Sequence, residues 1–300
     1  MVSLEHIRCG YVDGAHGQVH YRELGTGTPL VLLHWAPSNG RQYEHLMPLF
    51  AARGFRVLAV DIPGYGNSHK HTAGWSCAEM GAELAIALHR LGGVSRGFLC
   101  GGHLSAAVVA EMAIAEPARW PRIVLDGSPT LTRAQFATLM ASFADLSPKW
   151  SEDGAHERFA WRMTERFLHE WNPDYRATPE NFAVQYAYMA DYLQMGFAPI
   201  RAFIEPGSGK PGGLATYDAL GRWPLIASKV LALTAEREAL RVGHEAALAR
   251  LQHHVAHEFK GAHPLLIPER ATEYVATIAD FLSAPEVARD KKSAMPSISG

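Results

Sequence analysis

The stretch that decides the fold is GFLCGGHLSAAVVAEMAIAEP, residues 97–117. It begins with an apolar run, passes through small residues and continues with apolar residues at helical spacing. This pattern predicts a strand, a tight turn and a helix. Small residues suit a turn in which neighbouring chain segments approach closely. His103 lies at the centre of this turn, so an imidazole is expected at the tip of the strand.

The composition is that of a globular protein with a large core. Hydrophobic residues make up 48% of the 300 residues and charged residues 19%, as in ordinary soluble domains. The net charge of −2 gives no electrostatic basis for binding nucleic acid or an anionic membrane. Three cysteines do not suggest a disulfide framework, and the sequence shows neither a leader pattern nor an apolar run of membrane length. We therefore expect a cytoplasmic protein with no nucleic-acid or membrane partner.

Apolar runs rich in β-forming residues alternate with helical patterns along most of the chain. The expected strands are residues 18–24, 29–34, 55–61, 97–102, 122–128, 229–236 and 254–261. Helical patterns occupy residues 41–54, 76–93, 105–117 and 271–282. Strands that are apolar almost throughout are covered on both faces, which is typical of a parallel sheet. The pattern predicts an α/β fold with a doubly wound, mostly parallel sheet.

One long segment interrupts this alternation. Residues 131–222 contain helical pieces rich in aromatic side chains and no convincing strand. We interpret them as a helical cap inserted into a core formed by residues 1–130 and 223–283. The polar residues 284–300 are expected to form a disordered tail.

Two further segments carry a family resemblance. Residues 31–68 read VLLHWAPSNGRQYEHLMPLFAARGFRVLAVDIPGYGNS, which is similar to the HGxP loop, the following helix and the D-x-P-G-x-G-x-S segment of the α/β-hydrolase superfamily. The chain resembles the capped branch of that superfamily, which contains haloalkane dehalogenases, epoxide hydrolases and C–C hydrolases, over about residues 15–283. The resemblance implies an α/β-hydrolase fold, but this fold hosts many reactions.

The family's turn between strand and helix reads Gly-x-nucleophile-x-Gly, and the resemblance assigns its register. With His103 at the nucleophile position, Gly101 lies two residues before it, Glu111 eight after and Pro117 fourteen after, as is common in the family. Placing Ser105 there instead puts a histidine on a required glycine. The register therefore favours His103, and the chain departs from the serine of ordinary hydrolases.

The resemblance also implies a base and an acid. A family base follows the last strand, and KGAHPLLIPE places His263 there. LALTAEREAL places Glu238 at the acid position, where it would orient His263. Asp126, at the end of a neighbouring strand, is the alternative acid. The simpler reading is a capping histidine and surface salt bridges.

Oxyanion stabilisation would come from the backbone N–H groups of Leu104 and Ala36, which do not depend on side-chain identity. Trp35 replaces the glycine of the family loop and would narrow the pocket. His34 is a structural histidine in the resembled loop and receives no catalytic role.

The cap aromatics suggest an apolar substrate pocket between cap and core, with Trp161 and Tyr186 as tentative wall residues. Aromatic residues at helical spacing also serve as packing. Two histidines and a carboxylate can form a metal site, but the spacing does not require one, so we expect neither metal nor cofactor.

These residues lead to three hypotheses. The first is a hydrolase for a small apolar or aromatic ester, lactone or ketone-type substrate. It would use His103 at the nucleophile position, His263 as base and Glu238 as the acid that orients the base. The second is a cofactor-free lyase or decarboxylase that uses the His103–His263 pair for proton transfer. The third is an inactive ligand-binding protein of the same fold. The expected binding partner is a small-molecule substrate. The sequence is also compatible with a homodimer.

Overall fold

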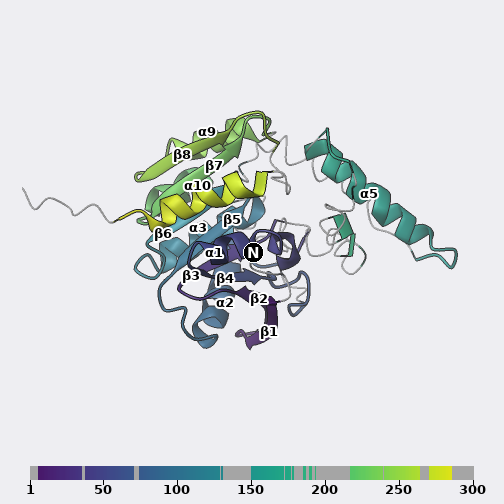
Figure 1. Cartoon of the computed structure of the whole chain (residues 1–300), viewed down its shortest axis with the longest axis horizontal. Helices are drawn as coiled ribbons and strands as arrows, with labels where there is room; N and C mark the ends of the chain where they lie inside the picture. The colour runs from purple at the N-terminus through teal and green to yellow at the C-terminus, as the bar shows by residue number, and fades with distance from the viewer. Residues whose placement is uncertain are drawn as a thin grey trace, which may run out of the picture.

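A computed structural model shows an α/β core built on one eight-stranded sheet (Figure 1). The structure describes residues 6–35, 38–70, 74–128, 130, 150–171, 173–176, 178, 185–186, 189–190, 193, 217–238, 240–263 and 270–285. The strands are β1 (Arg8–Asp13), β2 (Gln18–Leu24), β3 (Thr28–Leu33), β4 (Phe55–Val60), β5 (Phe98–Gly102), β6 (Arg122–Asp126), β7 (Lys229–Ala235) and β8 (His254–Phe259).

The order of the strands in the sheet is β1-β2-β4-β3-β5-β6-β7-β8. The first two pairings, β1 with β2 and β2 with β4, are antiparallel, and all the others are parallel. The predicted mostly parallel sheet is therefore confirmed. Strand β1 is not predicted from the sequence, because its side chains are largely exposed.

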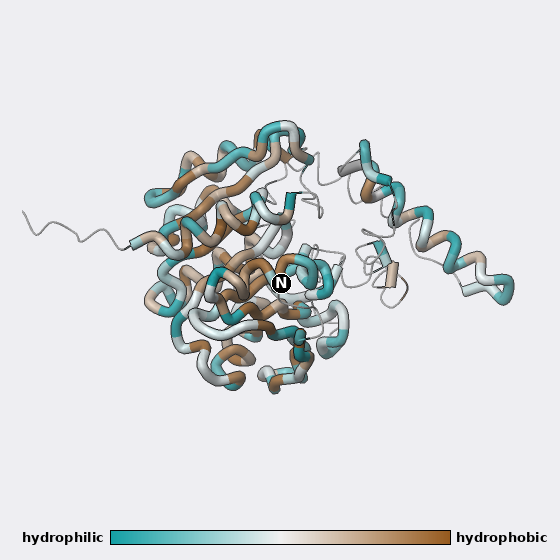
Figure 2. The backbone as a smooth tube through the Cα atoms, in the orientation of Figure 1, coloured by the Kyte–Doolittle hydropathy of each residue, from teal (hydrophilic) through white to brown (hydrophobic). Residues whose placement is uncertain are grey.

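Helices cover both faces of the sheet. They are α1 (Met47–Ala52), α2 (Cys77–Arg90), α3 (Leu104–Ala115), α9 (Arg241–Leu248) and α10 (Ala271–Ser283). Side chains of β3 alternate between the two cores: Val31 and Leu33 pack with α2 and α3, while Leu30 and Leu32 pack with α1 and α10. Both sets are fully buried, which is why the strand sequences are continuously apolar. Figure 2 shows the hydrophobic residues concentrated in the sheet.

Glu111 of α3 holds the chain where it re-enters the core. Its carboxylate accepts hydrogen bonds from the Arg222 guanidinium at 2.9 and 2.6 Å and from the Tyr217 hydroxyl at 3.0 Å. Arg222 ends the short helix α8 (Ala219–Arg222), which leads through η4 (Trp223–Leu225) into β7. The contact fixes α3, the helix that follows His103, against the returning chain.

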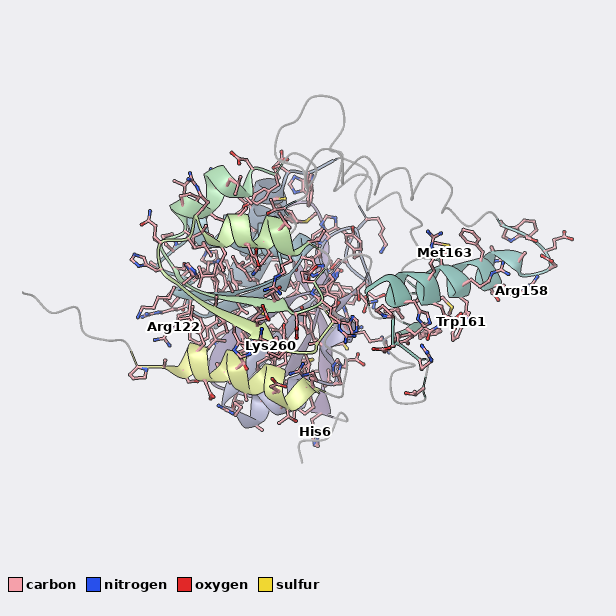
Figure 3. All side chains as sticks on the ribbon, turned by 90° about the horizontal axis from the view of Figure 1, so that it is seen from above. His6, Arg122, Arg158, Trp161, Met163 and Lys260 are labelled. Carbon is pink, nitrogen blue, oxygen red and sulfur yellow. The ribbon has the colours of Figure 1, made fainter. Side chains whose placement is uncertain are left out.

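Most of the residues assigned to the cap and the tail lie outside the described part of the chain, and the domain boundaries remain a prediction. Within 131–222 the structure shows α5 (Ala155–Trp171), which extends away from the core (Figures 1 and 3). Of the helices in the described ranges, none combines the length and apolar character needed to cross a bilayer.

Candidate functional site

The site lies at the carboxyl ends of four parallel strands. His103 directly follows β5, Gly127 follows β6, Glu238 comes three residues after β7, and His263 comes four after β8. Because parallel strands end on one edge of the sheet, these residues gather there, where α/β proteins commonly bind ligands.

The turn after β5 is strained at His103. Its φ of 49° makes it the one non-glycine residue with positive φ in the described part of the chain. Such a conformation costs about 1–3 kcal/mol and is concentrated at functional sites. A Cβ added to Gly102 would lie 1.7 Å from Nε1 of Trp35, and one added to Gly101 would lie 2.9 Å from the carbonyl oxygen of Ser105. The close approaches explain the small residues around the histidine.

Ser105 has a structural part in this turn. Its hydroxyl accepts a hydrogen bond from the N–H of Gly102 at 2.9 Å and donates to the carbonyl oxygen of Leu33 at 2.8 Å. The side chain is completely buried. Ser105 thus ties the turn to β3, in agreement with the register that places His103, not Ser105, at the tip.

The His103 imidazole binds Glu238. Nε2 of His103 lies 3.1 Å from Oε2 of Glu238, and the two side chains are 14% and 1% exposed. Oε1 of the same carboxylate accepts a hydrogen bond from the N–H of Leu240 at 2.9 Å. Both carboxylate oxygens therefore have a donor, so Glu238 is held in one orientation and fixes the orientation of the imidazole.

The buried pair has opposite pKa shifts. Burial alone would lower the pKa of His103, but the Glu238 charge and hydrogen bond, with a smaller effect of Asp126, raise it above the ordinary value. Burial would likewise raise the pKa of Glu238, but the charge and hydrogen bond of His103 lower it. His103 is therefore a base that holds its proton more strongly than a free histidine.

In the part of the chain that the structure describes, the carboxylate of Asp126, the alternative acid, makes no hydrogen bond to a histidine side chain. Its carboxylate accepts a hydrogen bond from the Tyr274 hydroxyl of α10 at 2.9 Å. Burial raises its pKa to about 6 against the opposing effects of His103 and Tyr274. Its backbone oxygen accepts a hydrogen bond from the N–H of His103 at 2.8 Å, so Asp126 contributes to the turn through its main chain.

The position of His263 differs from the expected pairing with Glu238. The Arg237 guanidinium donates to Nε2 of His263 at 3.0 Å, and Asp174 lies 3.7 Å from the same nitrogen. Among the described residues, no hydrogen bond joins His263 to His103 or Glu238. The turn after β7 explains the difference: the N–H of Arg237 bonds to the oxygen of Ala262 beside His263, whereas the next side chain points to β5.

The loop after β3 brings Trp35 to the imidazole. The Trp35 and His103 rings are stacked, with centroids 5.5 Å apart and planes inclined by 20°. On another side, a Cβ added to Gly127 (φ 72°) would lie 2.5 Å from Cδ2 of His103. Two neighbouring loops therefore restrict the imidazole.

The remaining predicted site residues have the following positions. Leu104 begins α3, as expected for an N–H donor next to His103. Ala36, the other predicted donor, lies outside the described residues. Trp161 is partly buried on α5, away from the sheet (Figure 3), and Tyr186 is 47% exposed. Their place in a pocket wall stays a prediction.

A buried polar network holds the loops around the site. Asp61 accepts hydrogen bonds from the Gly40 N–H at 2.7 Å and the Arg22 guanidinium at 3.0 Å, and lies 2.9 Å from Nδ1 of His20. Burial would raise the pKa of this carboxyl, but His20 and Arg22 lower it to about 2.

His34 connects the loop after β3 with the loop after β4. Its Nε2 accepts a hydrogen bond from the N–H of Ile62, and its Nδ1 donates to the oxygen of Trp35.

Sequence analysis gave no role to His244 of α9, which is buried and acts electrostatically on Glu238 and His103. A lone histidine in an amphipathic helix carries no signal that separates it from packing residues. Among the described residues, no group of three or more His, Cys, Asp or Glu side chains is arranged to hold a metal ion.

Comparison with known proteins gives one family match. The model of the family described as alpha/beta hydrolase fold matches residues 28–192, which is more than half of the chain.

Two curated relatives are similar over part of their length. A 2-hydroxy-6-oxononadienedioate/2-hydroxy-6-oxononatrienedioate hydrolase of Burkholderia vietnamiensis is 30% identical over 131 residues, 42% of this chain and 46% of that protein. Bifunctional epoxide hydrolase 2 of Rattus norvegicus is 28% identical over 123 residues, 38% of this chain and 22% of that protein. The chain thus matches less than half the length of these relatives.

Solved structures share the fold at low identity. The enol-lactonase from Burkholderia xenovorans LB400 has a TM-score of 0.73 and 15% identity, covering 92% of this chain and 100% of that one. The naproxen esterase from Bacillus subtilis has a TM-score of 0.72 and 18% identity, covering 92% and 91%.

Proposed function

Because this chain belongs to the α/β-hydrolase fold family, we propose that it hydrolyses a small apolar or aromatic ester, lactone or ketone-type substrate with His103 as the reactive group. The observation that carries this proposal is the hydrogen bond between His103 and Glu238 at the strained turn after β5. The similar proteins include hydrolases named for a 2-hydroxy-6-oxo diacid, an enol-lactone and naproxen. We take from these names only the carbonyl class of substrate.

Glu238 determines which nitrogen of His103 reacts. With Nε2–H donating to the carboxylate, the lone pair of the neutral imidazole is on Nδ1. Attack by Nδ1 on the carbonyl of an ester or lactone would form an acyl–Nδ1 bond while the acyl C–O bond breaks, and the departing alkoxide would take a proton from water. A water molecule would then add to the acyl carbon, which releases the carboxylic acid and restores the free imidazole. Glu238 then stabilises the positive charge on the ring, as the acid does in a serine triad.

Backbone and side-chain groups near His103 supply the other parts of the mechanism. The N–H groups of Leu104 and Ala36 are the proposed donors to the oxyanion. His263 is the proposed base for the water that opens the acyl-imidazole, and this role requires Arg237 to release Nε2. Since no metal or cofactor enters these steps, the reaction needs only substrate and water.

A second candidate is a cofactor-free lyase or decarboxylase. The raised pKa of His103 favours it, because the imidazolium then persists to a higher pH than that of a free histidine and can act as a proton donor. His103 and His263 would transfer the proton without a covalent intermediate.

The pH dependence of kcat/KM separates the two candidates. Hydrolysis by neutral His103 requires kcat/KM to rise as the pH increases through the raised pKa of His103. For a lyase that uses the imidazolium as its acid, kcat/KM should instead fall as the pH rises through that pKa. The assay uses a panel of activated esters, thioesters and lactones and of 2-oxo and 2-hydroxy-6-oxo acids, with His103→Ala as the inactive reference.

The panel also tests the inactive-binder hypothesis. Tight binding of an apolar compound, with no turnover of any panel member and no effect of His263→Ala, would exclude both enzymatic candidates. The variant His103→Ser tests whether the surrounding site supports ester hydrolysis with a serine as the nucleophile. A gain of esterase activity in this variant would show that the oxyanion donors and the base are in place.

A further inference from the structure

His244 is a buried histidine next to the proposed reactive pair. It lies in the first turn of α9, where its N–H bonds to the oxygen of Leu240, and the residue is 1% exposed. The preceding Gly243 lets this turn lie directly against the loop after β6, because an added Cβ would be 2.0 Å from the carbonyl oxygen of Thr130. His244 is therefore a buried side chain on a helix turn that lies against the loop after β6.

Both ring nitrogens of His244 are buried without a hydrogen-bond partner among the described residues. Glu238 binds His103 through one carboxylate oxygen and the N–H of Leu240 through the other, and it does not bond to the His244 ring. Buried polar atoms are paired in the large majority of cases, so two unpaired nitrogens on one side chain call for an explanation.

Leu240 links the first turn of α9 to the pair. Its N–H donates to Oε1 of Glu238 at 2.9 Å, and its oxygen accepts from the N–H of His244 at 3.0 Å.

Burial lowers the pKa of His244 to about 4, the charge of Glu238 opposes this, and the charge of His103 adds to it. Glu245 and Arg241, on the same helix, act on it as well. His244 is consequently neutral at physiological pH, with one N–H donor and one acceptor nitrogen.

We propose that His244 binds a hydroxyl oxygen, either of a water molecule or of the substrate, beside the His103–Glu238 pair. A hydroxyl both donates and accepts a hydrogen bond, so it matches the neutral imidazole, whereas a carboxylate offers only acceptors. This inference rests on the proposed function and extends it, because hydrolysis consumes one water molecule and a subsite for a hydroxyl group would select among carbonyl substrates.

His244→Phe tests the proposal, with His257→Phe as the matched control. His257 on β8 also has a buried ring nitrogen, Nε2, without a partner in the described structure, but it contributes no described electrostatic effect on His103 or Glu238. Phenylalanine removes the unpaired nitrogens in both variants, so thermal stability should be retained or raised in both. The proposal requires kcat/KM to fall at least tenfold in His244→Phe alone, with partial recovery in His244→Gln. Wild-type activity in a stable His244→Phe variant would overturn it.

Paired substrates distinguish the two sources of the hydroxyl. We compare an active ester that carries a hydroxyl group with the same ester lacking it. If the substrate hydroxyl binds His244, His244→Phe raises KM for the hydroxylated ester only. If water binds there, kcat falls by a similar factor for both esters.

A readout without turnover separates this inference from the proposed function. If no panel compound is hydrolysed, the proposed function fails, and the inference is then decided by NMR of ¹⁵N-histidine-labelled wild-type protein. A cross-peak between the His244 ring N–H and bound water supports the subsite. A ring N–H of His244 with no cross-peak to water or to a bound hydroxylated ester overturns it.

Discussion

Replacing Glu238 by glutamine keeps the size of the side chain and removes the charge that faces His103. Hydrogen bonds to charged groups contribute about 1.5–3 kcal/mol, and removing one partner of a fully buried ion pair costs about 3–5 kcal/mol. Because His103 is 14% exposed and glutamine can still accept a hydrogen bond, we expect a loss of about 2–3 kcal/mol in the free energy of unfolding at the most favourable pH.

The favourable pH follows from the two shifts. The pKa of His103 is raised in the folded protein, so its contribution is complete below the ordinary value of about 6.5 and disappears as the pH rises through the folded-state pKa. The pKa of Glu238 is lowered, so its contribution is present above about 4.5 and disappears as the pH falls through the folded-state pKa. Both contributions are complete between these ordinary values.

Urea unfolding of wild type and Glu238→Gln at about pH 5.5 and about pH 9 measures the difference. The variant should lose most stability at the lower pH and less at the higher. In an NMR titration, the pKa of His103 should fall in the variant, because burial is then opposed only by the smaller effect of Asp126. Equal losses of stability at both pH values, together with an unchanged His103 titration, would refute the pairing.

Three other substitutions test the framework around the pair. Ser105→Ala leaves the Gly102 N–H unpaired, so it should lower the free energy of unfolding by about 1–3 kcal/mol in chemical denaturation. The rate of ester hydrolysis should stay within a few-fold of wild type. Loss of all activity without loss of stability would point to a nucleophilic serine. Gly127→Ala places a methyl group against the His103 imidazole, at a positive φ that disfavours alanine. It should lower the free energy of unfolding by about 1–2 kcal/mol and the rate of ester hydrolysis more than tenfold. Wild-type activity would contradict the described contact. Asp61→Asn removes the buried carboxylate that binds Arg22, so the free energy of unfolding measured in urea should fall by about 3–5 kcal/mol. A fall of less than about 1 kcal/mol would show that this network does not stabilise the fold.

The fold could be predicted because its signals are local and repeated. Each buried parallel strand is apolar along its whole length, and the seven predicted strands correspond to β2–β8 within a few residues. The edge strand β1 has no such pattern, because its residues are mostly exposed and it pairs only with β2. Its formation depends on the neighbouring strand.

The place of His103 at the turn after β5 could be predicted, because glycines at fixed spacing reflect close backbone contacts that the structure contains. Its role in catalysis stays a prediction, and the side chain that it pairs with could not be predicted. Which histidine Glu238 faces depends on the turn that follows β7, where Arg237 and Glu238 point to different strands. His244 is linked to Glu238 through the main chain of Leu240, and α9 packs against the loop after β6. These contacts have no sequence signature.

Trapping the covalent intermediate is the most direct test of whether the His103 imidazole is the nucleophile that carries the acyl group. The protein is mixed with an activated ester, quenched in acid within one turnover, digested and analysed by peptide mass spectrometry. We expect an acyl group on His103 in the wild type, at a lower level in Glu238→Gln and absent in His103→Ala. Acylation of Ser105, or rapid hydrolysis that persists in His103→Ala, would contradict it.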